Sequence, residues 1–211
     1  QITAMQPIDV SIHAYGVATG LSGGVDSFCT IADYHCRQPP ENLQLTHLIY
    51  NDAVFRPENE ESIFDTRLQL LSQAAERLGL PLIAVRSNLQ DFHQLRGLNY
   101  ARTHTLRNTS VALALQNGLG RFLYSSAYAY HELHGGPATS PALSDPMLLA
   151  LLSTDALRTS SVGSEYLRIE KMSRIVEVTE THQFLHVCID SDSRVNCSQC
   201  WKCLQTQFTL E

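Results

Sequence analysis

Two groups of residues in this chain have the types and spacing that chemistry requires. The first is the run of residues 21–27, Leu-Ser-Gly-Gly-Val-Asp-Ser, and the second is a set of four cysteines near the other end, Cys188, Cys197, Cys200 and Cys203. Glycine backbone and hydroxyl groups can hold an anion. Four thiolates can hold a soft metal ion.

The glycine run stands between two segments of different period. Residues 12–17 are mostly apolar, as in a buried strand, and the residues after the glycines are apolar at helical spacing (Val25, Phe28, Cys29 and Ala32). A strand, a tight turn and a helix N-terminus are therefore expected. Gly23 and Gly24 let backbone N–H groups point toward one place, the helix dipole adds positive charge there, and Ser22 and Ser27 add hydroxyls. This combination predicts a cradle for phosphate.

The run differs from the common nucleotide-binding P-loop, which requires a lysine before its final Ser or Thr. Here Asp26 occupies the place where a cation would be expected. A carboxylate inside a phosphate cradle is useful if it helps to hold a Mg²⁺ ion that bridges phosphate oxygens. The alternative is an ordinary glycine turn of an α/β domain.

Residues 22–27, S-G-G-V-D-S in a strand-to-helix turn, resemble the PP-loop of the ATP pyrophosphatases. These enzymes cleave ATP between the α and β phosphates and release pyrophosphate. The resemblance implies that ATP and Mg²⁺ are cofactors. It also implies that ATP is bound by the loop residues (Leu21, Ser22, Gly23, Gly24, Val25, Asp26 and Ser27), with catalytic roles for Asp26 and Ser27.

The rest of the chain alternates between strand and helix patterns. Strands are expected at residues 12–17, 45–50, 81–85, 121–126 and 185–189, and helices from residue 25 and at 60–78, 104–116 and 169–178, with a further helix starting at Asp145-Pro146. This is an α/β pattern with a parallel sheet of about five strands flanked by helices, Rossmann-like and, by resemblance, HUP-type. Residues 1–184 form the expected ATP-binding domain, and residues 185–211 form a small C-terminal zinc knuckle packed on it.

The place of the ligand follows from this topology. Ligands of open parallel sheets bind beyond the carboxyl ends of the strands, where the strand order reverses. The first strand is the natural switch point. Tyr50 and Asn51, at the end of the second strand, are therefore expected beside the adenine or ribose.

The cysteines contain two overlapping C-x-x-C turns plus a fourth thiol, a pattern typical of tetrahedral Zn²⁺. A closed four-thiolate site has no open coordination position, so the zinc would be structural. Two disulfides or an iron–sulfur cluster are the alternatives. The layout resembles zinc-containing 7-cyano-7-deazaguanine synthase-like members of the same superfamily.

That resemblance extends to Arg107-Asn108 and to Glu170-Lys171. It implies that Arg107 binds a phosphate or adenylate oxygen and that Lys171 neutralises pyrophosphate. For each residue the alternative is a charge on a solvated helix face. His104 is either an acid–base group or simply a helix-start residue.

Bulk properties limit the partners. The formal charge is −6 and the 15 basic residues form no run, which argues against a nucleic-acid surface. No apolar run is long enough for a membrane span. There is no secretory signal, and the cysteines are crowded at one end, so a cytoplasmic location is expected. The chain begins at Gln1 without Met, so an upstream segment could be missing.

The predicted activity is an ATP-dependent ligase. It would adenylate a carboxylate or amide oxygen of a small-molecule or peptide substrate, release pyrophosphate, and allow attack by a nitrogen nucleophile. A homodimer is compatible with the sequence. The first alternative is sulfur transfer to the activated carbonyl, with Cys29 or Cys36 as a persulfide carrier, although Cys29 also fits a core position. The second is a non-catalytic nucleotide-binding subunit.

Overall fold

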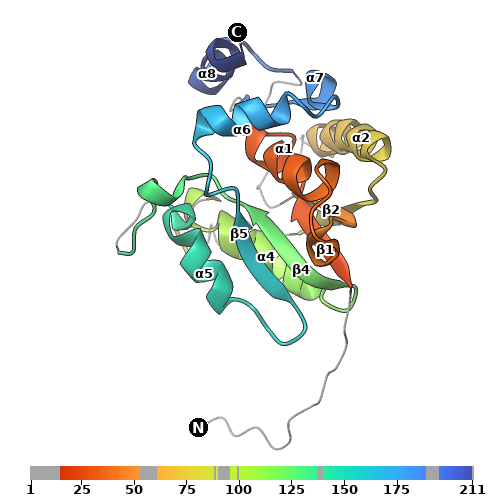
Figure 1. The fold of residues 1–211 in the computed structure, drawn as a ribbon, viewed down its shortest axis with the longest axis vertical. Coiled ribbons are helices and arrows are strands. Elements are labelled where there is room, and N and C mark those ends of the chain that lie inside the picture. The colour runs from red at the N-terminus through yellow and green to blue at the C-terminus, as the bar shows by residue number, and fades with distance from the viewer. Residues whose placement is uncertain are drawn as a thin grey trace, which may run out of the picture.

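The computed structural model describes residues 15–52, 61–87, 89, 96–98, 100–136, 140–188 and 195–210. Its centre is a parallel sheet of five strands in the order β3-β2-β1-β4-β5 (Figure 1). The strands are β1 (Gly16–Gly20), β2 (His47–Asp52), β3 (Leu82–Arg86), β4 (Leu119–Ser125) and β5 (Arg158–Val162). The order reverses at β1, because the chain first builds outward through β2 and β3 and then returns to the other side of β1 with β4.

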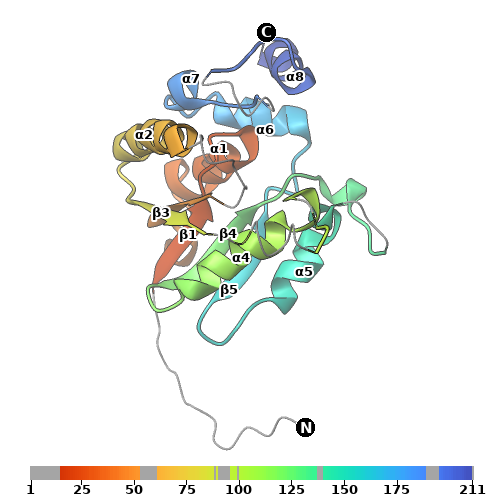
Figure 2. The same ribbon diagram turned by 180° about the vertical axis from the view of Figure 1, so that it is seen from behind.

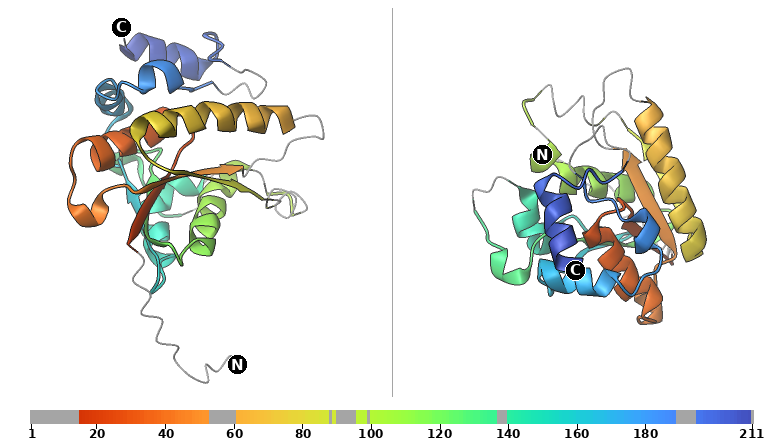
Figure 3. Two further views of the ribbon diagram at one scale, coloured as in Figure 1. Left: turned by 90° about the vertical axis from the view of Figure 1, so that its right-hand side faces the viewer. Right: turned by 90° about the horizontal axis from the view of Figure 1, so that it is seen from above.

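Helices cover both faces of the sheet, as two crossover directions require. One face carries α1 (Val25–Ile31), α2 (Glu61–Leu78) and α6 (Arg168–Ile175); the other carries α4 (His104–Ala114) and α5 (Asp145–Leu151) (Figure 2). The short helix α7 (Thr181–Phe184) and α8 (Trp201–Leu210) lie beyond α1 and α2, on the side away from the sheet (Figure 3).

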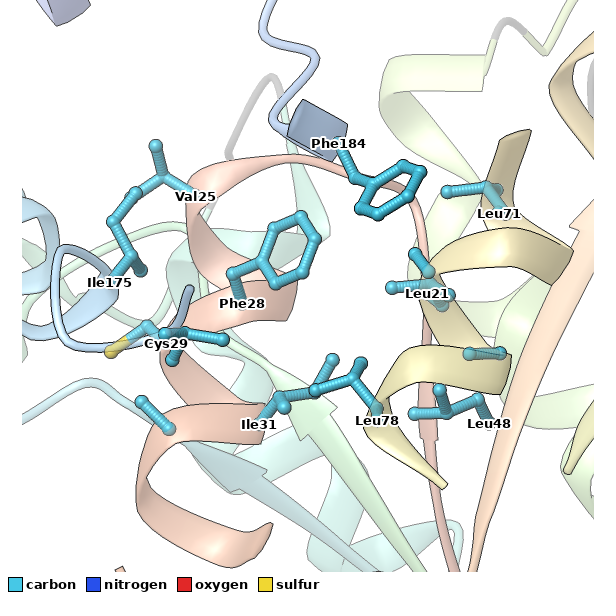
Figure 4. Packing of buried hydrophobic residues seen from close by; sticks show 14 of the residues in the cluster. Leu21, Val25, Phe28, Cys29, Ile31, Leu48, Leu71, Leu78, Ile175 and Phe184 are labelled. Carbon is cyan, nitrogen blue, oxygen red and sulfur yellow. The ribbon is translucent and has the colours of Figure 1, made fainter. Parts of the chain in front are cut away.

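The larger core lies between the sheet and the α1 face. Leu21, Phe28, Leu71 and Phe184 meet there, with side chains that are at most 3% exposed (Figure 4). Burying a side chain of this size contributes about 1.5–3 kcal/mol. Val187 and Cys203 belong to the same core, so residues of the expected C-terminal segment pack directly on the α/β unit.

Most expected elements are present, but the fifth strand was placed wrongly. Residues 185–188 form no strand, and residues 189–194 lie outside the described residues. The fifth strand is β5, whose sequence Arg-Thr-Ser-Ser-Val has no apolar run. It lies at the sheet edge and pairs with a single neighbour, β4, so it buries less apolar surface than a central strand. Apolar periodicity in the sequence therefore does not identify β5 as a strand.

Other boundaries also differ from expectation, by one to three residues in β2, β4, α4 and α6. The first strand is β1, Gly16–Gly20, so it begins later than expected and runs to the glycine loop; residues 12–14 of the expected strand lie outside the described residues. The helix expected from Asp145 begins there, but Ser144 is the N-cap and Asp145 is the first helical residue. Two short 3₁₀ turns, Tyr130–Glu132 and Pro141–Ser144, occupy part of the polar segment before it.

Candidate nucleotide site and cysteine centre

The glycine loop follows β1 and ends at the first turn of α1. Gly23 has φ of +79°, a conformation that glycine adopts without strain, and Gly24 is the N-cap. A Cβ on Gly23 would lie 3.3 Å from Leu71 Cδ2 and 3.4 Å from the Phe184 carbonyl oxygen. Glycine is therefore required at position 23 both by the turn and by the close packing around it.

The first turn of α1 contains backbone N–H groups that are available to bind a ligand. The first bond of the helix runs from Phe28 N–H to the Gly24 carbonyl at 3.1 Å. Among the described residues, no group accepts a hydrogen bond from the N–H of Val25, Asp26 or Ser27. These are the donors that a helix start offers to an anion. The helix continues through a π-helical turn, Ala32–Cys36, so its dipole extends beyond α1 itself.

The two loop serines are held within the loop. Ser27 Oγ donates to the Gly24 carbonyl at 2.9 Å, and Ser22 Oγ lies 3.3 Å from both Ser27 Oγ and the Gly24 nitrogen. These bonds, all within the loop, fix the orientation of the two hydroxyls.

Lys171 reaches this loop from α6. Its Nζ is 3.0 Å from Asp26 Oδ1 and also donates to the Ser126 carbonyl at the end of β4, and its side chain is only 2% exposed. Gly163, after β5, lies beside the same side chain: a Cβ added there would lie 3.9 Å from Lys171 Nζ. The alternative of a solvated helix face is therefore wrong for Lys171. The structure brings Lys171 and Asp26 together across 145 residues of sequence.

Arg168 is a second cation on the same carboxylate. Its Nη1 lies 3.3 Å from both oxygens of Asp26, and both side chains are 30% exposed. Arg168 precedes Lys171 by one helical turn and was not predicted from the sequence as a site residue. Two cations against one carboxylate leave the immediate surroundings of the loop with an excess of positive charge.

A pocket of about 310 Å³ opens beside the loop at the carboxyl ends of β1, β2 and β4. The loop side of its wall is formed by Leu21, Ser22, Asp26 and Ser27. Its volume falls at the lower end of the range of about 300–1,000 Å³ for small-molecule sites. The pocket lies at the switch point of the sheet, where a ligand is expected.

Tyr50 and Asn51 line this pocket together with Ile49 from the same strand. The Tyr50 ring stacks on Phe64 with ring centroids 5.1 Å apart, so it is part of the core as well as of the wall. Asn51 Nδ2 donates to Asn108 Oδ1 at 3.1 Å. The buried side-chain oxygen of Asn51 has no hydrogen-bond partner among the described residues, which is uncommon for a buried amide.

The wall opposite the loop is polar. Tyr100, His104, Asn108 and Tyr124 line it, and His104 Nδ1 shares a hydrogen bond of 2.8 Å with the Tyr124 hydroxyl. Burial raises the pKa of Tyr124 well above its ordinary value, so this hydroxyl stays protonated. Burial, and then the charge of Arg107, lower the pKa of His104.

Arg107 does not line the pocket. It is 1% exposed, on α4, with its guanidinium 5.7 Å from the centroid of the Tyr100 ring. It is therefore not a surface charge; its guanidinium contacts the pocket wall at Tyr100, and its charge acts on His104. Asn108 is the member of the Arg107-Asn108 pair that reaches the wall.

Two other hollows lie away from this site. One of about 690 Å³ is at the amino ends of β1, β4 and β5, the wrong edge of a parallel sheet for a ligand at the switch point. The other, of about 310 Å³, is a mainly apolar groove between α6, α7 and α8. Neither contains residues of the glycine loop.

The four cysteines form the second candidate site. The sulfur atoms of Cys188, Cys197, Cys200 and Cys203 all lie within 4.8 Å of one another, and those of Cys197 and Cys203 are 3.9 Å apart. No disulfide links them. Tetrahedral zinc with Zn–S bonds of about 2.3 Å places its sulfurs about 3.8 Å apart. The cluster could therefore bind a metal ion with little rearrangement.

The electrostatic surroundings of these thiols differ. Backbone N–H groups of Gln199 and Cys200 lower the pKa of Cys197, and the Cys200 nitrogen lies 3.3 Å from its sulfur. Burial raises the pKa of Cys203 to about 12. The remaining two cysteines lie outside the cluster: Cys29 is 2% exposed in the core, where burial raises its pKa to about 12 as for Cys203, and Cys36 is exposed.

Neither the models of known protein families nor the curated proteins compared with this chain give a match. In the described residues no helix is long and apolar enough to cross a membrane.

Proposed function

We propose that this protein is a HUP-type PP-loop enzyme that uses ATP and Mg²⁺ to adenylate a carboxylate or amide oxygen of a small-molecule or peptide substrate, with release of pyrophosphate. A nitrogen nucleophile would then displace AMP. The observation that carries the proposal is the glycine loop itself, which combines the N–H groups of the first turn of α1, the positive-φ turn at Gly23 and the Asp26–Lys171 pair, and which lines the pocket with Ser22, Asp26 and Ser27.

The residues present fit the phosphates of a nucleotide. The loop N–H groups and the hydroxyls of Ser22 and Ser27 would hold phosphate oxygens, and Lys171 and Arg168 would balance their charge. Asp26 would hold Mg²⁺, which polarises the phosphate that is attacked. The orphaned side-chain oxygen of Asn51 supports an adenine or ribose donor at the end of β2.

The cysteine centre fits zinc. It offers four sulfur ligands and no carboxylate or imidazole, and its sulfurs already surround a common point. The role of the ion would be structural, because no position is left open for a substrate. The four thiols also fit an iron–sulfur cluster, and elemental analysis distinguishes the two.

Sulfur transfer is the second candidate, but the free thiols give it little support. Cys29 lies in the core, and burial followed by the charge of Glu180 raises the pKa of Cys36. A persulfide carrier acts as a thiolate, so a raised pKa works against it. The third candidate, a nucleotide-binding subunit without catalysis, predicts ATP binding with no AMP formed.

The test is a screen of the purified chain with Mg²⁺, ATP and a panel of carboxylates and amides, with AMP and pyrophosphate measured together. Lys171→Met should abolish product formation. Arg174→Met is the matched control, because Arg174 lies on the same helix but pairs with Asp33 at 3.2 Å. Calorimetry that detects no binding of ATP to the metal-loaded chain would refute the proposal.

A further inference from the structure

The segment between α7 and the cysteine centre is also the segment that supports the glycine loop. Phe184, the last residue of α7, inserts its ring into the core between Phe28 and Leu71 (Figure 4). Two residues later, the N–H of His186 donates to the Gly23 carbonyl at 2.7 Å. Two residues after that comes Cys188, a member of the four-cysteine cluster.

A side-chain contact reinforces this backbone bond. Arg67, on α2, extends its Nη2 to His186 Nδ1 at 2.9 Å and to the Ser22 carbonyl at 3.5 Å. His186 itself is 9% exposed. The C-terminal segment thus holds the Gly23 carbonyl directly through His186, whereas Arg67 of α2, which also contacts His186, holds the Ser22 carbonyl.

Asn196 links the same segment to the other cysteines. Its Nδ2 donates to the Leu185 carbonyl at 2.8 Å, and its Oδ1 accepts from the N–H groups of Val187 and Cys188 at 2.9 and 3.3 Å. Asn196 directly precedes Cys197. Within residues 185–188 the N–H groups therefore bond to Thr181, Gly23 and Asn196, and the Leu185 carbonyl bonds to Asn196, instead of to a neighbouring strand.

We infer that the four-cysteine centre positions the glycine loop. A metal ion bound by the cysteines fixes Cys188 relative to Cys197, Asn196 transmits that position to residues 185–188, and His186 transmits it to Gly23. Asn196 and His186 are positioning residues, and metal occupancy sets the affinity of the loop for its ligand. The part of this inference that concerns ATP rests on the proposed function; the part that concerns loop order does not.

Hydrogen exchange measured by mass spectrometry tests the loop without any nucleotide. The metal-loaded chain is compared with the chain after chelation, for peptides that cover residues 20–30 and, as an internal reference, β4. Chelation should speed exchange in the loop peptide by about tenfold, as for a typical coupling between sites, and leave β4 unchanged. Equal exchange in the loop would overturn the inference. Faster exchange throughout the sheet would overturn it too, because the ion would then be a condition for the whole fold.

Asn196→Ala tests the link while keeping all four thiols. Bound metal should stay near the wild-type amount, while exchange in the loop peptide rises and the Kd for Mg²⁺-ATP increases about tenfold. Thr206→Val is the matched control, since its hydroxyl bonds only to the Lys202 carbonyl of its own helix at 2.8 Å. Wild-type loop exchange in a metal-loaded Asn196→Ala chain would refute the link. If that variant loses its metal, the hydrogen exchange of the chelated wild-type chain decides whether the cysteine centre positions the loop.

The two proposals fail in different ways. A chain whose loop orders on metal binding but which never binds ATP retains the positioning role and loses the proposed function. If the chain binds Mg²⁺-ATP equally well with and without a metal ion at the four cysteines, and hydrogen exchange in the loop is unchanged, the proposed function is retained and the positioning role is lost.

Discussion

Asp26→Asn should reduce both stability and function, and the two effects can be separated. Removing the carboxylate charge leaves the Lys171 ammonium, 2% exposed, with the Ser126 carbonyl as its remaining acceptor among the described residues and with Arg168 nearby. Breaking a buried ion pair by removing one partner costs about 3–5 kcal/mol. Because Asp26 is 30% exposed, solvent screens part of this loss, and we expect about 2–3 kcal/mol.

Lys171→Met should cost less, about 1–2 kcal/mol, because Asp26 keeps Arg168 and the methionine fills the space of the lysine stem. The double variant Asp26→Asn with Lys171→Met leaves no unpaired buried charge. Its loss of stability should be smaller than the sum of the single losses by about 1–2 kcal/mol. Function should not return, because both groups that would act on Mg²⁺ and phosphate are gone.

Urea denaturation followed by circular dichroism measures these free energies, and release of AMP or binding of ATP measures function. Asp26→Asn should lower the urea midpoint by about 1 M if the slope is about 2 kcal/mol per molar. Arg168→Gln is the control for an exposed partner of the same carboxylate and should cost less than about 1 kcal/mol. Strictly additive losses in the double variant would refute the pairing argument, and wild-type function in Asp26→Asn would refute its role.

Three further predictions concern other parts of the molecule. Burial raises the pKa of Asp145 from 3.8 to about 6, so between these pH values the folded state binds a proton that the unfolded chain has lost. The stability of the wild type should therefore fall as pH rises from about 4 to about 6. In urea denaturation, Asp145→Asn should be more stable than wild type by up to about 3 kcal/mol at about pH 8 and show no gain at about pH 4. Gly23→Ala should cost about 1–2 kcal/mol through its positive φ, whereas Gly20→Ala, with open space around the new Cβ, should stay within about 0.5 kcal/mol. Cys188→Ser should lose the bound metal in elemental analysis, while Cys36→Ser, outside the cluster, should keep it.

The parts of the fold that follow from apolar periodicity were predicted well. Helix α2 matches its expected range almost to the residue, because its apolar side chains recur at spacings of three and four along a helix that Gly79 terminates. The fifth strand shows the limit of that reasoning, because it was predicted at residues 185–189 but is β5 in the structure. The second segment is the more apolar, but its backbone groups bond to Gly23 and Asn196 instead of a neighbouring strand.

The candidate site was predicted where a short motif defines it and missed where three-dimensional packing does. The glycine loop and the four cysteines are contiguous or nearly so, and local spacing alone brings their groups together. Tyr124 and Arg168 come from β4 and α6, and only the crossover of the chain places them at the pocket and the loop. Arg168 lies one helical turn before Lys171, so its position could be predicted only if Lys171 were already known to face the loop. For Arg107 the sequence could not distinguish a group in the pocket from one buried behind Tyr100.

The charge arrangement around the glycine loop shows how this loop can lack a lysine of its own. In this chain the cations are supplied by α6, whose Lys171 passes beside Gly163 and Ser126 before it reaches Asp26. The loop can therefore place a carboxylate beside the N–H groups of the helix start without becoming repulsive to an anion, because Lys171 and Arg168 together exceed the charge of Asp26. A ligand that brings both phosphate and a divalent cation would satisfy each partner of this group at once: the cation meets the carboxylate, and the phosphates meet the ammonium and guanidinium. A phosphate without a cation would leave Asp26 opposing it, so binding of ATP should be stronger with Mg²⁺ than without.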